Sequence, residues 1–255
     1  MTRTFLVPSA LFLAWTFGVP QTSVLAQDTR HLTPEELGRL HMQRIEDKLH
    51  VFSEADVRFM QDMIVHHSQA LVMSQFAPLN GASDEVEVLA ARIINAQLDE
   101  IRMMQTWLLD RGIAAPAVEY SDIEPTITMI QPSKADDRAH ESAHGSDSDQ
   151  AMTDHGTMDH SGHMDHADMV GMLSLVQLAE VRDARGPSFD TIFLEYLIQH
   201  HNGAVLMVRE LFDHDGAAQG VETYRIASDI QVGQRTEIAR MQQMLNERMV
   251  SPGGN

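Results

Sequence analysis

The sequence contains no cysteine, so disulfide bonds, thiolate metal sites and a lipid-modified N-terminal cysteine are all excluded. Aromatic residues make up only 5% of the 255 residues, whereas methionine occurs 17 times. Because β-strands favour aromatic and β-branched side chains, this composition favours a helical protein. Lysine and arginine are scarce, 18 against 37 aspartates and glutamates, and the formal net charge is −19. We therefore expect no binding to nucleic acid and an attraction for cations.

The sequence also lacks a hydrophobic run long enough for a clear membrane span, but its first 26 residues resemble a secretory signal peptide. Arg3 supplies a positive start, residues 5–19 are apolar, and residues 24–26 form a small-residue cleavage site. We expect export to the periplasm, cleavage near Ala26 and no stable membrane insertion afterwards. An uncleaved N-terminal anchor is the alternative.

Helix start and stop signals recur along the rest of the chain. Thr33, Pro34 and Glu36 form a capping box with proline at the first helical position, and Ser53, Ser83 and Ser188 can cap later helices. No strand is expected. These signals predict helices over residues 34–50, 54 to about 78, 84–110, 169–183, 189 to about 215, and 221–249.

The two halves of the chain repeat each other, which predicts one helical hairpin in each half. Residues Asp56, Phe59, Ile64, His66, His67, Ala70 and Met73 recur 134 positions later as Asp190, Phe193, Ile198, His200, His201, Ala204 and Met207. Residues Ile93, Gln97, Glu100, Ile101, Met104 and Leu108 recur 137 positions later as Ile230, Gln234, Glu237, Ile238, Met241 and Leu245. We expect an all-α bundle of two repeated hairpins, residues 27–115 and 169–250, joined by a linker over residues 116–168.

The linker has the composition of a disordered metal collector. Residues 134–170 contain six histidines and four methionines and almost nothing that could build a core. Imidazole binds several transition metals, whereas thioether prefers soft Cu(I), so the mixture favours copper over zinc. A solvated acidic spacer is the alternative. The predicted linker ligands are His155, Met158, His160, His163, Met164 and His166.

Each hairpin also offers candidate ligands on facing helices, because positions three and four apart share one face of a helix. A glutamate in a core-facing stripe is costly unless it is paired or bound to metal. The predicted ligands are Met63, His66, His67, Met73, Glu100 and Met104 in the first half, and His200, His201, Met207, Glu237 and Met241 in the second. The alternative is that histidine–glutamate hydrogen bonds fix the helix register and that the methionines only fill the core.

The pattern F-x-x-x-M/L-I-x-H-H-x-x-A-x-x-M, followed by Q-x-x-E-I-x-x-M, resembles domain-of-unknown-function family 305. Both halves carry this pattern. The resemblance implies a ferritin-like helical bundle, export, and a role in copper binding and tolerance. The first half has Ser68 and Gln69 where the second has Asn202 and Gly203, and Leu197 replaces the methionine of the pattern.

Three functions are compatible with these residues. The first is an exported protein that sequesters or delivers copper, with Cu(I) favoured and zinc as the alternative, whose partners are metal ions and another periplasmic copper protein. The second is a ferritin-like metal oxidase, and the third is a structural module without a core metal. A di-iron site needs about four carboxylates and two Glu-x-x-His pairs, whereas each hairpin has one inward glutamate and no such pair. We therefore expect a binding protein rather than an enzyme.

Overall fold

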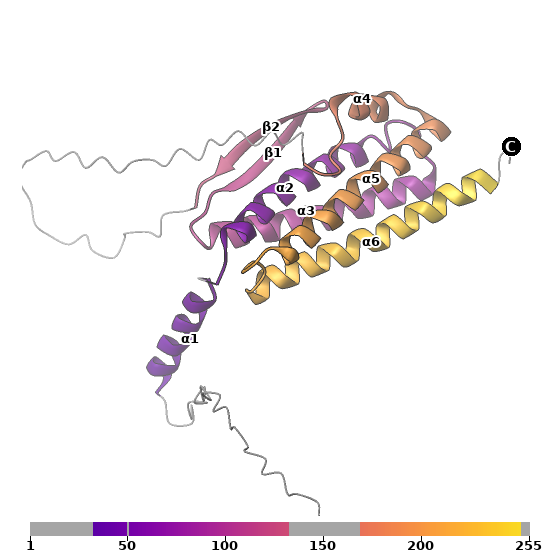
Figure 1. Cartoon of the computed structure of the whole chain (residues 1–255). Helices are drawn as coiled ribbons and strands as arrows, with labels where there is room; N and C mark the ends of the chain where they lie inside the picture. Colours follow the sequence, from indigo (N-terminus) through magenta and orange to yellow (C-terminus); the bar gives the residue numbers. More distant parts are fainter. Residues whose placement is uncertain (1–32, 50, 133–168, 251–255) are drawn as a thin grey trace, which may run out of the picture. The chain divides into compact units, whose positions relative to one another are not determined.

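The computed structural model describes residues 33–49, 51–132 and 169–250, which form six helices and two strands (Figure 1). The chain divides into two units between Gln43 and Arg44, and α1 (Pro34–Leu49) spans that boundary. Its capping box forms as predicted: the Glu36 carboxylate accepts from the Thr33 amide at 2.8 Å, and the Thr33 hydroxyl accepts from the Glu36 amide at 3.2 Å. The predicted signal peptide and most of the predicted linker lie outside the described residues.

Four long helices make up most of the second unit, and the prediction of a mainly helical protein is confirmed. Helix α2 (Glu54–Gln75) packs along α3 (Asp84–Leu109), and α5 (Gly186–Asp213) packs along α6 (Val221–Val250). Helix α2 also packs on α5, and α3 contacts α6. Ser53 begins α2 with a complete capping box, in which its hydroxyl accepts from the Asp56 amide at 3.2 Å.

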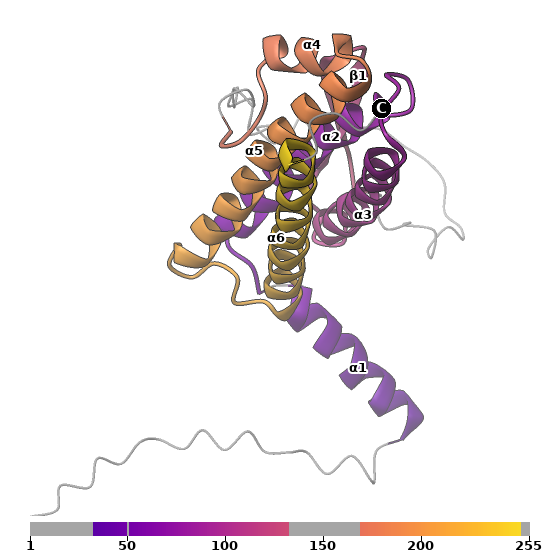
Figure 2. The same ribbon diagram turned by 90° about the vertical axis from the view of Figure 1, so that its right-hand side faces the viewer.

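The elements of this unit lie in three layers (Figures 1 and 2). Helices α2 and α5 form the middle layer, with α3 and α6 on one side and α4 (Leu175–Asp183) and the β-strands on the other. A helix that is covered on opposite sides can be apolar all round. Accordingly, every residue from position 63 to position 70 is buried. This burial explains how two adjacent histidines can both be removed from water.

The prediction that the chain has no strand was wrong. Strands β1 (Ala115–Ser121) and β2 (Glu124–Ile130) form an antiparallel hairpin, with Ala115 opposite Ile130 and Ser121 opposite Glu124. Asp122 adopts a φ of 59° in the two-residue turn, a conformation that such turns require. Pro116 and Pro125 obscured the signal, since proline is unfavourable in central strands but is tolerated where every strand is an edge. The hairpin occupies residues that the sequence analysis assigned to the start of the linker.

Two predicted helix starts were also displaced. Helix α4 begins at Leu175 rather than at residue 169, because Gly171 has a φ of +84° and Ser174 forms the capping box with Gln177. Helix α5 begins at Gly186, before the expected cap at Ser188. Residues 169–173 are therefore an irregular segment that leads into α4.

Two aspartates at matching positions connect the hairpins to each other. The Asp56 carboxylate at the start of α2 accepts from the Ala218 amide, between α5 and α6, at 2.7 Å. The Asp190 carboxylate at the start of α5 accepts from the Ser83 amide, between α2 and α3, at 3.1 Å, and pairs with Arg248 at 2.8 Å. Both carboxylates are buried. Since the start of each helix meets the far end of the other hairpin, α2 and α5 run antiparallel.

Candidate metal centre

The two histidines of the first pair face different neighbours. His67 points towards α3, where its Nε2 lies 2.7 Å from Glu100 Oε2. His66 points towards α5, where its ring lies 3.9 Å from that of His200 between centroids, with 36° between the planes. Its Nε2 lies 3.3 Å from the carbonyl oxygen of Val170. The sequence left open which histidine of each pair faces the neighbouring helix; the antiparallel packing of α2 on α5 assigns His67 to α3 and His66 to α5.

The second pair repeats part of this arrangement. His201 Nε2 lies 2.7 Å from Glu237 Oε2 on α6. His200 Nε2 lies 3.1 Å from the backbone carbonyl oxygen of His66 on α2. All four imidazoles have no solvent exposure, whereas the side chains of Glu100 and Glu237 keep 16% and 21%. The two glutamates therefore lie at the edge of the core, with the histidines inside it.

These contacts fix where the ring protons lie. Carbonyl and carboxylate oxygens accept hydrogen bonds, so each of the four Nε2 atoms must carry a proton and donate it. In a neutral imidazole the lone pair then lies on Nδ1. None of the four Nδ1 atoms has a hydrogen-bond partner within the described part of the chain. The core thus contains four buried Nδ1 atoms without a hydrogen-bond partner among the described residues.

The central histidines are neutral at physiological pH. Burial, followed by the neighbouring His67, lowers the pKa of His66 from 6.5 to about 3. Burial, followed by His66, lowers the pKa of His200 well below its usual value. The cause is the same for both rings: a protonated imidazole in this core would lose its hydration and be repelled by any neighbouring imidazolium. Two neutral rings can therefore stack where two imidazolium ions could not.

The predicted methionine ligands are buried but do not gather at one point. Met63, Met104 and Met207 belong to one cluster of buried apolar side chains, and Met73 and Met241 to another. Among residues 33–49, 51–132 and 169–250, no group of three or more His, Asp and Glu side chains is arranged to hold a metal ion. The predicted ligands of the linker, from His155 to His166, lie outside the described residues.

The sequence analysis gave no role to Gln69, whereas it placed Gln97 in the pattern that the two halves share. Gln69 is buried on α2, and its amide bonds both backbone groups of Leu173, at 2.7 Å and 3.0 Å. Gln97 on α3 is also buried, and neither of its amide atoms has a partner among the residues described. The first half has Ser68 and Gln69 where the second half has Asn202 and Gly203. This difference between the halves was the one sign in the sequence of the contact between Gln69 and Leu173.

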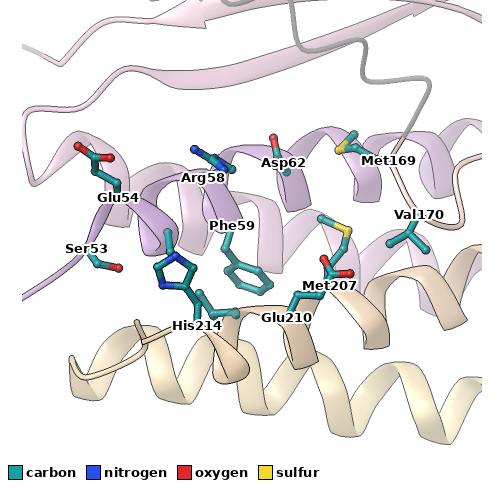
Figure 3. Close-up of a pocket in the computed structure, with 12 residues that line it drawn as sticks. Ser53, Glu54, Arg58, Phe59, Asp62, Met169, Val170, Met207, Glu210 and His214 are labelled. Carbon is teal, nitrogen blue, oxygen red and sulfur yellow. The ribbon is translucent and has the colours of Figure 1, made fainter. Parts of the chain in front are cut away.

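A cavity of about 740 Å³ opens between the first half of α2 and the second half of α5. Its walls combine apolar side chains, such as Phe59 and Met207, with charged ones, such as Glu210. Figure 3 shows Met169 and Val170 at one end of this cavity and Ser53 and His214 at the other. Val170, whose carbonyl accepts the hydrogen bond from His66 Nε2, is therefore also part of the cavity wall.

Comparisons with known proteins agree with this fold. A crystallised DUF305 fragment from Deinococcus radiodurans is 24% identical, covers 77% of this chain and 98% of its own, and superimposes with a TM-score of 0.53. A DUF305 protein from Streptomyces coelicolor is 23% identical, covers 76% and 93%, and has a TM-score of 0.52. CopM in its Cu(I)-bound form is 22% identical over 75% and 96%, with a TM-score of 0.46.

No curated protein matches the sequence. The family described as Domain of unknown function (DUF305) matches residues 56–245, which run from the first turn of α2 to the last part of α6 and include both histidine pairs. The match covers most of the chain, and the solved DUF305 structures share the helical fold. The chain therefore belongs to the DUF305 family.

Proposed function

We propose that this protein is an exported copper-binding protein that sequesters or delivers Cu(I), and that its buried histidines are ligands. One observation carries the proposal: four buried imidazoles donate from Nε2 to oxygen and leave Nδ1 without a partner. An unsatisfied buried polar atom costs about 1–3 kcal/mol, so four of them together need a physical reason. A metal that accepts the Nδ1 lone pairs supplies that reason.

The Nε2 contacts have the form of the outer shell of a metal site. Histidines that bind metals commonly donate their other ring proton to a carboxylate or a backbone carbonyl, which orients the ring and raises its basicity. Glu100 and Glu237 supply the carboxylates here, and Val170 and the His66 backbone supply the carbonyls. The glutamates would then orient the ligands and would not bind the metal, which modifies the role that the sequence analysis gave them.

Copper is favoured by the buried methionines of the two hairpins. Met63, Met104 and Met207 are buried in the same apolar cluster as Phe59, and thioether sulfur prefers soft Cu(I). Zinc sites use at least three protein ligands, almost always His, Cys, Asp or Glu, and the described residues contain no such group. A site of few soft ligands suits Cu(I) better than zinc, although zinc is kept as a competitor in the test below.

The matched contacts of the two hairpins support a duplicated unit. His67 with Glu100 and His201 with Glu237 have the same separation of 2.7 Å.

The proposed export rests on the signal-like N-terminus. Within the described ranges, no helix combines the length and apolar character that crossing a bilayer requires.

We propose binding rather than catalysis, because each hairpin, in the described part of the chain, has only one glutamate that contacts a histidine. Glu100 contacts His67 and Glu237 contacts His201, so the two carboxylates belong to separate pairs. A di-iron oxidase needs bridging carboxylates from several helices around one point. Oxygen consumption after addition of Cu(I) or Fe(II) tests this choice. Sustained turnover that requires His67 or His201 would overturn it.

The decisive experiment is an anaerobic Cu(I) titration of residues 27–255 in competition with a chromophoric chelator. It compares the parent chain with the quadruple substitution of His66, His67, His200 and His201 by glutamine, and with a deletion of residues 134–166 that retains Met169 and Val170. Substitution of the exposed His41 by glutamine is the matched control. Circular dichroism checks that each variant is folded.

We expect the deletion variant to keep the Cu(I) bound in the core. The quadruple variant should bind less Cu(I) than the parent chain by that same amount, and the His41 variant should bind as the parent does. If the deletion abolishes all binding and the quadruple substitution changes nothing, the core site is refuted and the histidine–glutamate pairs are structural. If Zn(II) displaces Cu(I) at equal concentration, the copper assignment is refuted.

A further inference from the structure

Residues 169–173, here called the strap, are fastened to α2 by one side chain. Gln69 Oε1 accepts from the Leu173 amide at 2.7 Å, and Gln69 Nε2 donates to the Leu173 carbonyl at 3.0 Å. Both residues are only 3% exposed. A buried amide that satisfies both backbone groups of one residue holds that residue in place, because each broken bond would leave a buried polar group unpaired.

The other side of the strap rests on α5 through two glycines. A Cβ atom on Gly203 would lie 2.1 Å from the Val170 carbonyl oxygen and 2.6 Å from the Gly171 Cα. Gly171 itself has a φ of +84°, which side chains rarely tolerate. The strap can therefore approach α5 closely only because both positions are glycine. Gln69 and Gly203 occupy matching positions of the two halves. The two halves differ here because Gln69 bonds the strap on one side and Gly203 makes room for it on the other.

The strap places the Val170 carbonyl against His66. The oxygen lies 3.3 Å from His66 Nε2, and without it that nitrogen would face no fixed acceptor among the described contacts. His200 differs, because its acceptor is the carbonyl of His66 in the backbone of α2. A helix backbone needs no strap to hold it. The tautomer of His66 thus depends on residues 169–173, whereas that of His200 does not.

We infer that Gln69 is a positioning residue: through the strap it selects the Nε2–H tautomer of His66 and so presents Nδ1 as the copper ligand. The ligand part of this inference rests on the proposed function, whereas the tautomer part does not. Outer contacts of this kind typically change metal affinity by about 10- to 100-fold when they are removed. The strap also forms part of the cavity wall, where Met169 and Val170 lie at one end (Figure 3).

The test is Gln69→Met, which keeps the side-chain length but removes both hydrogen bonds. Gln75→Met is the matched control, since Gln75 is exposed on the same helix. Long-range ¹H–¹⁵N spectra of the metal-free chain report the tautomer of each histidine, and Cu(I) competition reports affinity. We expect the Gln69 variant to show mixed tautomers at His66, an unchanged His200 and an affinity about 10-fold or more weaker. The control should match the parent in both measurements.

A second variant guards against misfolding. Gly203→Ala displaces the Val170 carbonyl from the α5 side with Gln69 intact, and should alter the same His66 signals. If His66 keeps the Nε2–H tautomer in both variants, the inference is overturned, whatever the copper result. If the tautomer changes while Cu(I) affinity does not, His66 is not a ligand, and that part of both proposals fails. If the parent chain binds no Cu(I), the proposed function fails, and the metal-free spectra still decide the role of Gln69.

Discussion

Two glycines inside helices should respond to alanine with opposite signs. Glycine in a helix interior is about 1 kcal/mol less favourable than alanine, so filling an empty position should stabilise the protein. Gly233 in α6 is such a position, because the nearest atom to an added Cβ is Glu100 Oε1 at 4.0 Å. We expect Gly233→Ala to raise the free energy of unfolding by about 0.5–1 kcal/mol.

Gly203 in α5 has the same local propensity but no space. An added Cβ would lie 2.1 Å from the Val170 carbonyl oxygen, so that oxygen must retreat by at least 0.9 Å to reach a separation of 3.0 Å. Overpacking of this kind typically costs about 1–3 kcal/mol. The weakened hydrogen bond from His66 adds about 1 kcal/mol. After the propensity gain of about 1 kcal/mol, Gly203→Ala should lower the free energy of unfolding by about 1–3 kcal/mol.

Urea denaturation followed by circular dichroism measures both changes, and unchanged m-values would show that the unfolding transitions are comparable. The difference between the two variants matters most, because the helix-propensity contribution cancels from it. If Gly203→Ala is as stable as Gly233→Ala, the close approach of the strap to α5 is wrong. If both variants are destabilised, the reasoning from helix propensity is wrong.

Three further predictions concern ionisable groups. The folded chain keeps His66 (pKa about 3) and His200 neutral, whereas the unfolded chain protonates them near pH 6.5. The free energy of unfolding should therefore fall as pH drops below about 6.5, by at most about 1.4 kcal/mol per pH unit for each histidine. Urea denaturation between pH 7.5 and 4.5 should show a smaller decline in His66→Gln. Glu100→Gln and Glu237→Gln should each cost about 0.5–1.5 kcal/mol, and clearly unequal losses in thermal unfolding would contradict the equivalence of the two pairs. Asp56→Ala removes an acceptor from three donors and should cost about 1–3 kcal/mol by urea denaturation; a neutral result would contradict its role in joining the hairpins.

Helical periodicity and capping residues predicted most of the secondary structure. The caps at Thr33 and Ser53 form as expected, because a capping box involves only four neighbouring residues. The helical spacing also placed the histidine pair of α2 opposite Glu100 on α3 without deciding which histidine meets it, and the structure shows His67 at 2.7 Å. Local rules fail where a partner supplies the missing interaction. Pro116 and Pro125 obscured the β-hairpin, which depends on pairing between strands and on packing against α2.

The sequence by itself determined which residues are shared between the two halves, including both histidine pairs and Asp56 with Asp190. Only the tertiary structure decided what each of them contacts. Adjacent residues on a helix point about 100° apart, so His66 and His67 had to face different neighbours, but the periodicity is the same whichever helices those neighbours are. The antiparallel packing of α2 on α5 brought His66 to His200, and the strap brought Val170 to His66, because both contacts join segments more than 100 residues apart.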